Sequence, residues 1–142
     1  MVKNMALLSA FAAAVFGGGY WLGSVRTAEA AANRVFELRT YHCNEGKLPN
    51  LQARFRNHTV KLFEKHGMTN VGYWVPMDEP ASKDTLVYML AYPDRESAKK
   101  AWEAFRTDAE WNKVREASEK DGKIVSKVDS IYLTPTDFSK MK

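Results

Sequence analysis

The chain has 142 residues, a formal net charge of +4 and one cysteine, Cys43. A lone cysteine cannot form an intramolecular disulfide, so burial of side chains must hold the fold together. The basic balance is mild, and no basic run is interleaved with stacking aromatics, which argues against nucleic acid as a partner. The length beyond residue 30 suits one domain with one core.

Residues 1–30 have the layout of a secretory signal peptide. Lys3 precedes an uncharged, mainly apolar run over residues 5–22, and small residues follow at Ala28, Ala30 and Ala32. We therefore predict a signal peptide over 1–30 and a periplasmic or secreted protein. The alternative is a retained membrane anchor formed by residues 5–22, since a run of that length approaches the lower limit for a spanning helix.

The first half of the domain predicts a strand, a helix and a second strand. VFELRTYHC, residues 35–43, alternates apolar and polar side chains, and residues 47–66 place apolar side chains at threes and fours. Gly67 follows where a helix end favours a residue with positive φ. Residues 68–76 are rich in aromatic and branched side chains and end at Pro76, which indicates a strand.

The second half predicts a strand, a helical region and a last strand. Residues 85–93 are nearly all apolar and end at a proline. Asp94 opens a helix that carries Trp102 and Phe105 on one stripe, and residues 107–110 resemble a capping box that starts a further helical segment. Residues 123–135 form the last predicted strand.

The order strand, helix, strand, strand, helix, strand predicts an α+β, ferredoxin-like βαββαβ fold with an antiparallel sheet and both helical regions on one face. The other face then needs a partner, because 12% of the residues are aromatic and residues 85–92 are apolar on both sides. We predict that two copies stack their sheets into a homodimer.

Several motifs in order resemble the NIPSNAP family. They are ELRTY (37–41), GKLPNLQARF (46–55), EKHGM (64–68), VGYW (71–74), DAEW (108–111) and LTPTDFS (133–139). The resemblance predicts a NIPSNAP-like domain over residues 33–139 and implies the dimeric α+β barrel fold. It implies no settled chemistry, and the export segment argues against carrying over the mitochondrial partners of eukaryotic relatives.

Glu37, Arg39 and Tyr41 alternate along the first strand and form the main candidate site. If the helices cover Phe36 and Leu38, these three side chains point into the barrel. Arg39 would then bind an anionic group, and Tyr41 or Glu37 would move a proton. The alternative is a Glu37–Arg39 pair that only satisfies itself or its dimer mate.

The histidines offer weaker candidates. His58 lies on or beside the apolar stripe of the first helix, where it could be a general base, an axial haem ligand or a packed histidine. His66 suits a structural role in the last turn of that helix. His42 and Cys43 point to opposite sides of a strand, so no metal site is predicted.

We therefore predict a homodimeric domain that binds a small apolar or aromatic ligand, or a protein partner, without a cofactor. The predicted ligand-binding residues are Arg39, Tyr41, Tyr73, Trp74 and Tyr88, while Trp102 and Trp111 are expected in the core. The alternatives are a small cofactor-free monooxygenase or isomerase that uses Glu37, Arg39, Tyr41 and His58, or a haem-binding protein.

Overall fold

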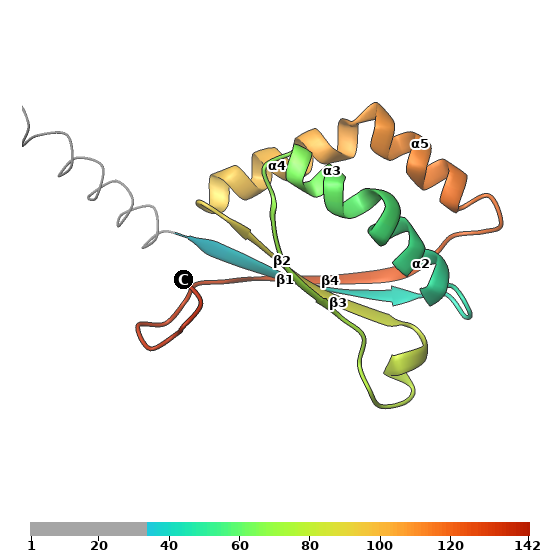
Figure 1. Ribbon diagram of the computed structural model, residues 1–142, viewed down its shortest axis with the longest axis horizontal. Helices are drawn as coiled ribbons and strands as arrows, with labels where there is room; N and C mark the ends of the chain where they lie inside the picture. Colours follow the sequence, from blue (N-terminus) through green and yellow to red (C-terminus); the bar gives the residue numbers. More distant parts are fainter. Residues whose placement is uncertain (1–33) are drawn as a thin grey trace, which may run out of the picture.

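The structure, a computed structural model, describes residues 34–142 and consists of a helical layer on one face of a four-stranded sheet (Figure 1). The predicted signal peptide or anchor lies outside the described residues. Among residues 34–142, no helix is both long and apolar enough to cross a membrane.

The elements follow the predicted order. The strands are β1 (Val35–Cys43), β2 (Thr69–Trp74), β3 (Thr85–Tyr92) and β4 (Val125–Leu133). The first helical region consists of α2 (Leu48–Arg54), a π-helical turn η1 (Phe55–Thr59) and α3 (Val60–Lys65); the second consists of α4 (Arg95–Thr107) and α5 (Ala109–Ser118). A short 3-10 turn, η2 (Ala81–Lys83), lies between β2 and β3.

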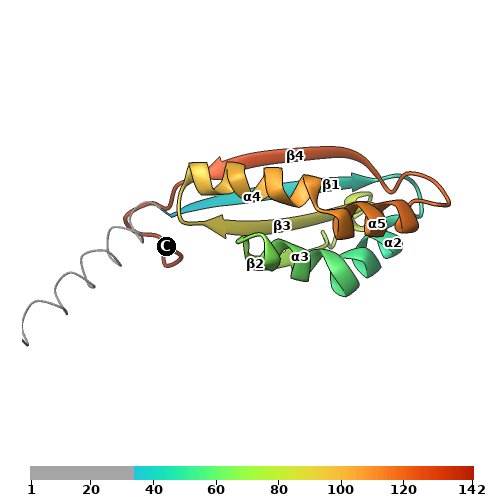
Figure 2. The same ribbon diagram turned by 90° about the horizontal axis from the view of Figure 1, so that it is seen from above.

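The sheet has the strand order β2-β3-β1-β4, and every pair is antiparallel. This order confirms the predicted ferredoxin-like fold. Seen from above, α4 runs over the middle of the sheet and α3 lies toward β2, while most of the outer strand β4 has no helix over it (Figure 2). The helix-bearing side of β4 is therefore accessible from the edge of the sheet.

Two aspartates start the helices of the second helical region. The side chain of Asp94 accepts a hydrogen bond from the backbone N–H of Ser97, and Asp108 accepts bonds from those of Glu110 and Trp111. Such caps satisfy backbone donors that have no partner inside the helix. A helix, α5, does begin at the predicted motif, but its cap is Asp108, while Thr107 ends α4 and bonds back to the carbonyls of Glu103 and Ala104.

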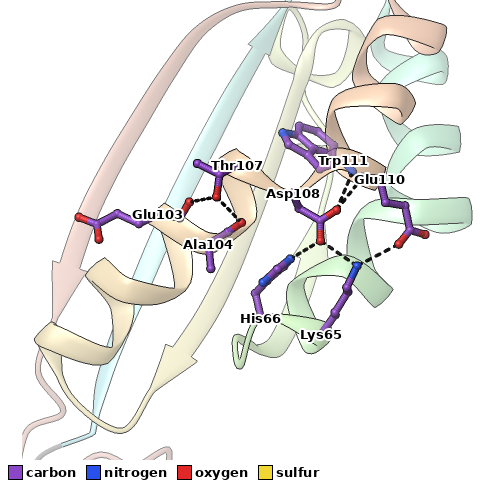
Figure 3. A network of polar contacts seen from close by, with 8 residues as sticks. All are labelled: Lys65, His66, Glu103, Ala104, Thr107, Asp108, Glu110 and Trp111. Carbon is purple, nitrogen blue, oxygen red and sulfur yellow. Dashed lines mark hydrogen bonds and ion pairs between the residues drawn. The ribbon is translucent and has the colours of Figure 1, made fainter.

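Asp108 also ties the two helical regions together (Figure 3). Its carboxylate lies 2.7 Å from Nε2 of His66 and 2.8 Å from Nζ of Lys65, both at the end of α3. Hydrogen bonds from Lys65 and His66 hold the pKa of Asp108 well below its usual range. His66 therefore has the structural role predicted for it, and Gly67 has the expected positive φ of 78°.

The helices cover the opposite face of β1 from the one the sequence suggested. Glu37 is only 1% exposed and bonds to Trp102 of α4, which places the Glu37 side of β1 under the helices. The expectation that Glu37, Arg39 and Tyr41 face the interior of a barrel of two sheets is therefore wrong. Leu38 and Thr40 lie on the helix-free face, because successive side chains of a strand point to opposite sides.

Phe36 is buried in spite of lying on the helix-free face. It lines a small hollow with residues of the C-terminal tail, among them Pro135 and Met141. The tail also accepts a hydrogen bond at the carbonyl of Lys142 from the side chain of Arg34. One end of the helix-free face is therefore covered by the chain itself.

The π-helical turn η1 changes which side chains of the first helical region are buried. The N–H of Val60 bonds to the carbonyl of Phe55, five residues back, and the hydroxyl of Thr59 donates to the carbonyl of Arg54. This wider turn brings Thr59 into the core and leaves His58 exposed. The placement of His58 on the buried stripe is therefore wrong.

Candidate functional site

A cleft opens between the helical layer and the β4 side of the sheet, with a volume of about 410 Å³. We call it the arginine cleft. It is lined from β1 by Glu37, Arg39 and Tyr41, from α4 by Trp102, Phe105 and Arg106, from α5 by Trp111 and Arg115, and from β4 by Ser130 and Tyr132. The volume falls in the range of about 300–1,000 Å³ that is typical of small-molecule sites.

Glu37 forms the buried polar centre of the cleft. Its Oε1 accepts hydrogen bonds from Arg39 and Ser130, each at 2.6 Å. Its Oε2 accepts bonds from the hydroxyl of Tyr92 at 2.8 Å and the indole N–H of Trp102 at 2.6 Å. Both oxygens are thus used twice, and the four donors come from three strands and one helix.

These contacts fix the protonation of Glu37. Burial alone would raise the pKa of this carboxyl, but hydrogen bonds from Ser130, Trp102 and Arg39 outweigh burial and hold the pKa below its ordinary value. Burial and the Glu37 carboxylate raise the pKa of Tyr92, which keeps its hydroxyl a donor. Glu37 is therefore an anion with saturated acceptors, which makes it a poor proton acceptor for a ligand.

Arg39 lies between Glu37 and the opening of the cleft. Its side chain is 16% exposed, and its guanidinium carbon lies 4.2 Å from the ring centre of Trp102 and 5.6 Å from that of Tyr41. Such cation–π contacts partly compensate for the lost hydration of the cation. The structure therefore brings Glu37, Arg39 and Tyr41 together, with Glu37 and Arg39 paired beside an open volume.

The other predicted ligand-binding residues do not join this cleft. Tyr88 is fully buried in the core, where its ring packs 5.2 Å from Tyr41 and 5.5 Å from Tyr73, measured between ring centres. Tyr73 and Trp74 line a different hollow of about 260 Å³, between β2 and η1. The five side chains predicted as one pocket are therefore divided between the cleft, the core and the β2 edge.

His58 is also remote from Glu37 and Arg39. It lines an open depression between the first helical region and α5, with Asn57 and Lys113 among its neighbours. His58 and the three residues of β1 therefore line different hollows. Within residues 34–142, no group of three histidine, cysteine, aspartate or glutamate side chains could hold a metal ion.

Sequence reasoning missed most of the cleft wall. Trp102 was expected only in the core; it is indeed buried, but its indole N–H also bonds to Glu37. Arg106, Arg115 and Tyr132 gave no pattern that separates them from solvated residues. One available signal was Trp102 four residues before Arg106, because positions i and i+4 share a helix face. Cys43 is buried, which raises its pKa to about 11 and leaves the thiol unreactive.

Comparison with known proteins agrees with this fold. The NIPSNAP family model matches residues 36–140. The chain belongs to the NIPSNAP family. No curated protein sequence gave a match.

Solved NIPSNAP structures have the same architecture. A NIPSNAP family protein from Agrobacterium tumefaciens is 19% identical, with a TM-score of 0.67 over 78% of this chain and 100% of the other. An uncharacterized NIPSNAP-like domain protein from Burkholderia xenovorans is 16% identical, with a TM-score of 0.66 over 76% and 90% of the two chains. The predicted fold class, an α+β fold with a four-stranded antiparallel sheet, is thereby confirmed.

A more distant similarity extends to an enzyme. SnoaB from Streptomyces nogalater, a cofactor-independent oxygenase, is 10% identical to this NIPSNAP domain, with a TM-score of 0.52 over 77% of this chain and 99% of SnoaB. At this identity the similarity concerns the fold alone, since one fold supports many activities.

Proposed function

We propose that this NIPSNAP protein is an exported homodimer that binds a small aromatic or apolar molecule in the arginine cleft. The observation that carries the proposal is the cleft itself, in which the aromatic walls surround one fixed polar centre, Glu37 with Arg39. Ligand sites combine an apolar lining with a few positioned polar groups in this way. The saturated acceptors of Glu37 favour binding over proton transfer, and a cleft of this size favours a small molecule over a protein partner.

The homodimer is supported by the helix-free face of the sheet. Trp74 is 51% exposed and Ile131 is 54% exposed on this face, next to Leu38, Val87 and Met89 in the register of the strands. Exposed apolar side chains of this kind favour a partner over water, and a second copy offers the same surface. The fold class, in which two sheets stack face to face, supports the same pairing.

Export is supported by the sequence of residues 1–30. Sequencing the N-terminus of the mature protein from its native host tests it: a start near residue 31 is expected after cleavage. A chain that still begins at Met1 would contradict cleavage and favour the anchor formed by residues 5–22.

Untargeted mass spectrometry of small molecules that copurify with the protein tests the binding function. A Ser130→Trp variant provides the comparison, because Ser130 lines the cleft and an indole there would fill it. A compound that copurifies with the parent should be lost from this variant and retained by Glu103→Trp, which adds an indole on the exposed side of α4. A compound that both variants retain would contradict the cleft as the site.

A cofactor-free monooxygenase is the second candidate function. The convergence of Glu37, Arg39 and Tyr41 beside one cleft favours it, as does the fold-level similarity to the oxygenase SnoaB. Oxygen uptake with a phenolic substrate, lost in Tyr41→Phe, would support this function. Uptake no faster than without protein would leave binding as the function of the cleft.

A further inference from the structure

The arginine cleft carries an excess of positive charge at the place where a ligand would lie. Three arginines, Arg39, Arg106 and Arg115, line it against one carboxylate, that of Glu37. The single negative charge of Glu37, which bonds to Arg39, offsets only one of the three positive charges. The field inside the cleft therefore favours an anion.

Arg39 makes few hydrogen bonds for an arginine whose side chain is only 16% exposed. A guanidinium has five N–H donors, and among residues 34–142 only one hydrogen bond from Arg39 is found, from Nη1 to Glu37. Its Nε is shielded from solvent and has no partner in the described part of the chain. A largely buried cation with unused donors is unfavourable unless another acceptor completes it.

Glu37 holds this guanidinium in place. Because Tyr92, Trp102 and Ser130 fix the carboxylate from three elements, the bond to Nη1 fixes Arg39 as well. One face of the guanidinium is covered by Trp102, at 4.2 Å from its ring centre, and its N–H donors point outward in its own plane. An incoming acceptor must then approach in the plane of the guanidinium, which is the geometry in which arginine binds carboxylates and related oxyanions.

The walls determine what the anionic group is attached to. Tyr41, Trp102, Phe105, Trp111 and Tyr132 surround the cleft, and Arg95 lies 3.1 Å above the ring centre of Tyr132. Flat side chains of this kind pack best against another flat, apolar body. A small inorganic anion would leave those walls without contacts.

We propose that the ligand of the arginine cleft is an aromatic anion, with its carboxylate, sulfonate or ionised hydroxyl group bound by Arg39. This inference rests on the proposed binding function and gives it a ligand class. Glu37 is then a positioning residue that orients Arg39, and Arg106 and Arg115, both exposed, attract the anion to the opening of the cleft.

A pair of fluorescent probes distinguishes the contribution of the anionic group to binding from that of the aromatic ring. 1-Anilinonaphthalene-8-sulfonate and N-phenyl-1-naphthylamine share one aromatic skeleton, and only the first carries a sulfonate. We expect the purified protein to bind the sulfonate at least about tenfold more tightly, since only the sulfonate can form charge-assisted hydrogen bonds with Arg39. Ser130→Trp should weaken the binding of both probes, because the added indole fills the cleft.

Arg39→Met should lower the affinity for the sulfonate by about tenfold or more and change the affinity for the neutral probe by less than about twofold. The affinity of Arg39→Lys for the sulfonate should lie between those of the parent and Arg39→Met, because lysine keeps the charge but lacks the planar guanidinium. Lys99→Met removes the same charge from the exposed side of α4 and should change neither affinity. Arg106→Met provides a variant at an exposed position and should weaken the sulfonate alone, even if Arg39→Met folds poorly.

Two results would overturn the inference. Sulfonate binding that is unchanged in both Arg39→Met and Arg106→Met would show that charge in the cleft does not select the ligand, while the binding function would stand. Equal losses for both probes in Arg39→Met would assign Arg39 a packing role only. If Ser130→Trp bound both probes as well as the parent, the cleft itself would be excluded and the proposed function would fail with the inference.

Discussion

Each face of the sheet carries side chains that are unusual for its exposure. Under the helices, β1 places a buried Glu37 and a largely buried Arg39. On the helix-free face the sheet presents Trp74 and Ile131, each more than half exposed. The buried polar network is the basis of the proposed ligand site, and the exposed apolar side chains are the basis of the proposed homodimer.

Removing the carboxylate at the centre of the covered face should have the largest effect. Glu37→Ala leaves Arg39 without its counterion and three further donors without their acceptor, so we expect a loss of about 3–5 kcal/mol in the free energy of unfolding. Urea denaturation measures it, with Glu45→Ala at an exposed site as the control. A loss below about 1 kcal/mol would mean that this face tolerates its buried charge without the network.

A charge on the helix-free face should disrupt the proposed dimer and leave each chain folded. Ile131 and Val128 lie on the same strand, are 54% and 41% exposed, and face opposite sides of the sheet, since they pair with Leu38 and Tyr41. Ile131→Asp should halve the mass in light scattering, because a buried carboxylate costs several kcal/mol, whereas Val128→Asp should remain dimeric. A parent of single-chain mass would contradict the pairing, as would dissociation of both variants alike.

Acid should loosen the helical layer over the covered face through Asp108. The folded pKa of Asp108 is lowered by Lys65 and His66, so its contribution to stability is present above the unfolded pKa of about 4 and is lost as the pH falls below it. Asp108→Asn should lower the melting temperature at pH 7 and reduce its fall between about pH 5 and 2. Asp137→Asn, in the exposed tail, should have the same dependence of melting temperature on pH as the parent. If Asp108→Asn also kept that dependence, the Asp108 carboxylate would be excluded as its cause.

The smallest effect is expected at Gly72, on the helix-free face. A Cβ at Gly72 would lie 2.5 Å from the end of the Trp74 ring, so Gly72→Ala must rotate this exposed indole. The free energy of unfolding should change by less than about 1 kcal/mol, but the Trp74 emission should shift and the dimer should weaken. In a Trp74→Ala background the same substitution should leave the dimer unchanged; weakening there would exclude the indole as the cause.

Periodicity and breaking residues predicted the elements well, because strand and helix patterns are local. The strand over 35–43 matches β1, and Asp94, Gly67 and the prolines marked real boundaries. The face of β1 was not predictable from β1 alone, since both of its sides carry apolar and polar residues. Partners far along the chain, Tyr92, Trp102 and Ser130, decided it by donating to Glu37.

The candidate site was predicted in part for the same reason. Glu37, Arg39 and Tyr41 are neighbours along one strand, so their proximity followed from the sequence. The exposed position of His58 depends on the wider turn at η1, and an ordinary helical repeat cannot reveal a π turn. The separation of Trp74 from Tyr41 depends on sheet order and side-chain direction, which only the fold determines.

The C-terminal tail makes the two ends of the helix-free face different. Because the tail packs over Phe36 at the end of β1 where the strand begins, while Trp74 lies near the opposite end beside Val87, the two ends of this face are not equivalent. A twofold axis relating two such faces must then pass nearer to the Trp74 end. The last residues of the chain would thus set the lateral offset of a symmetric pair, and shortening them would free the axis to move.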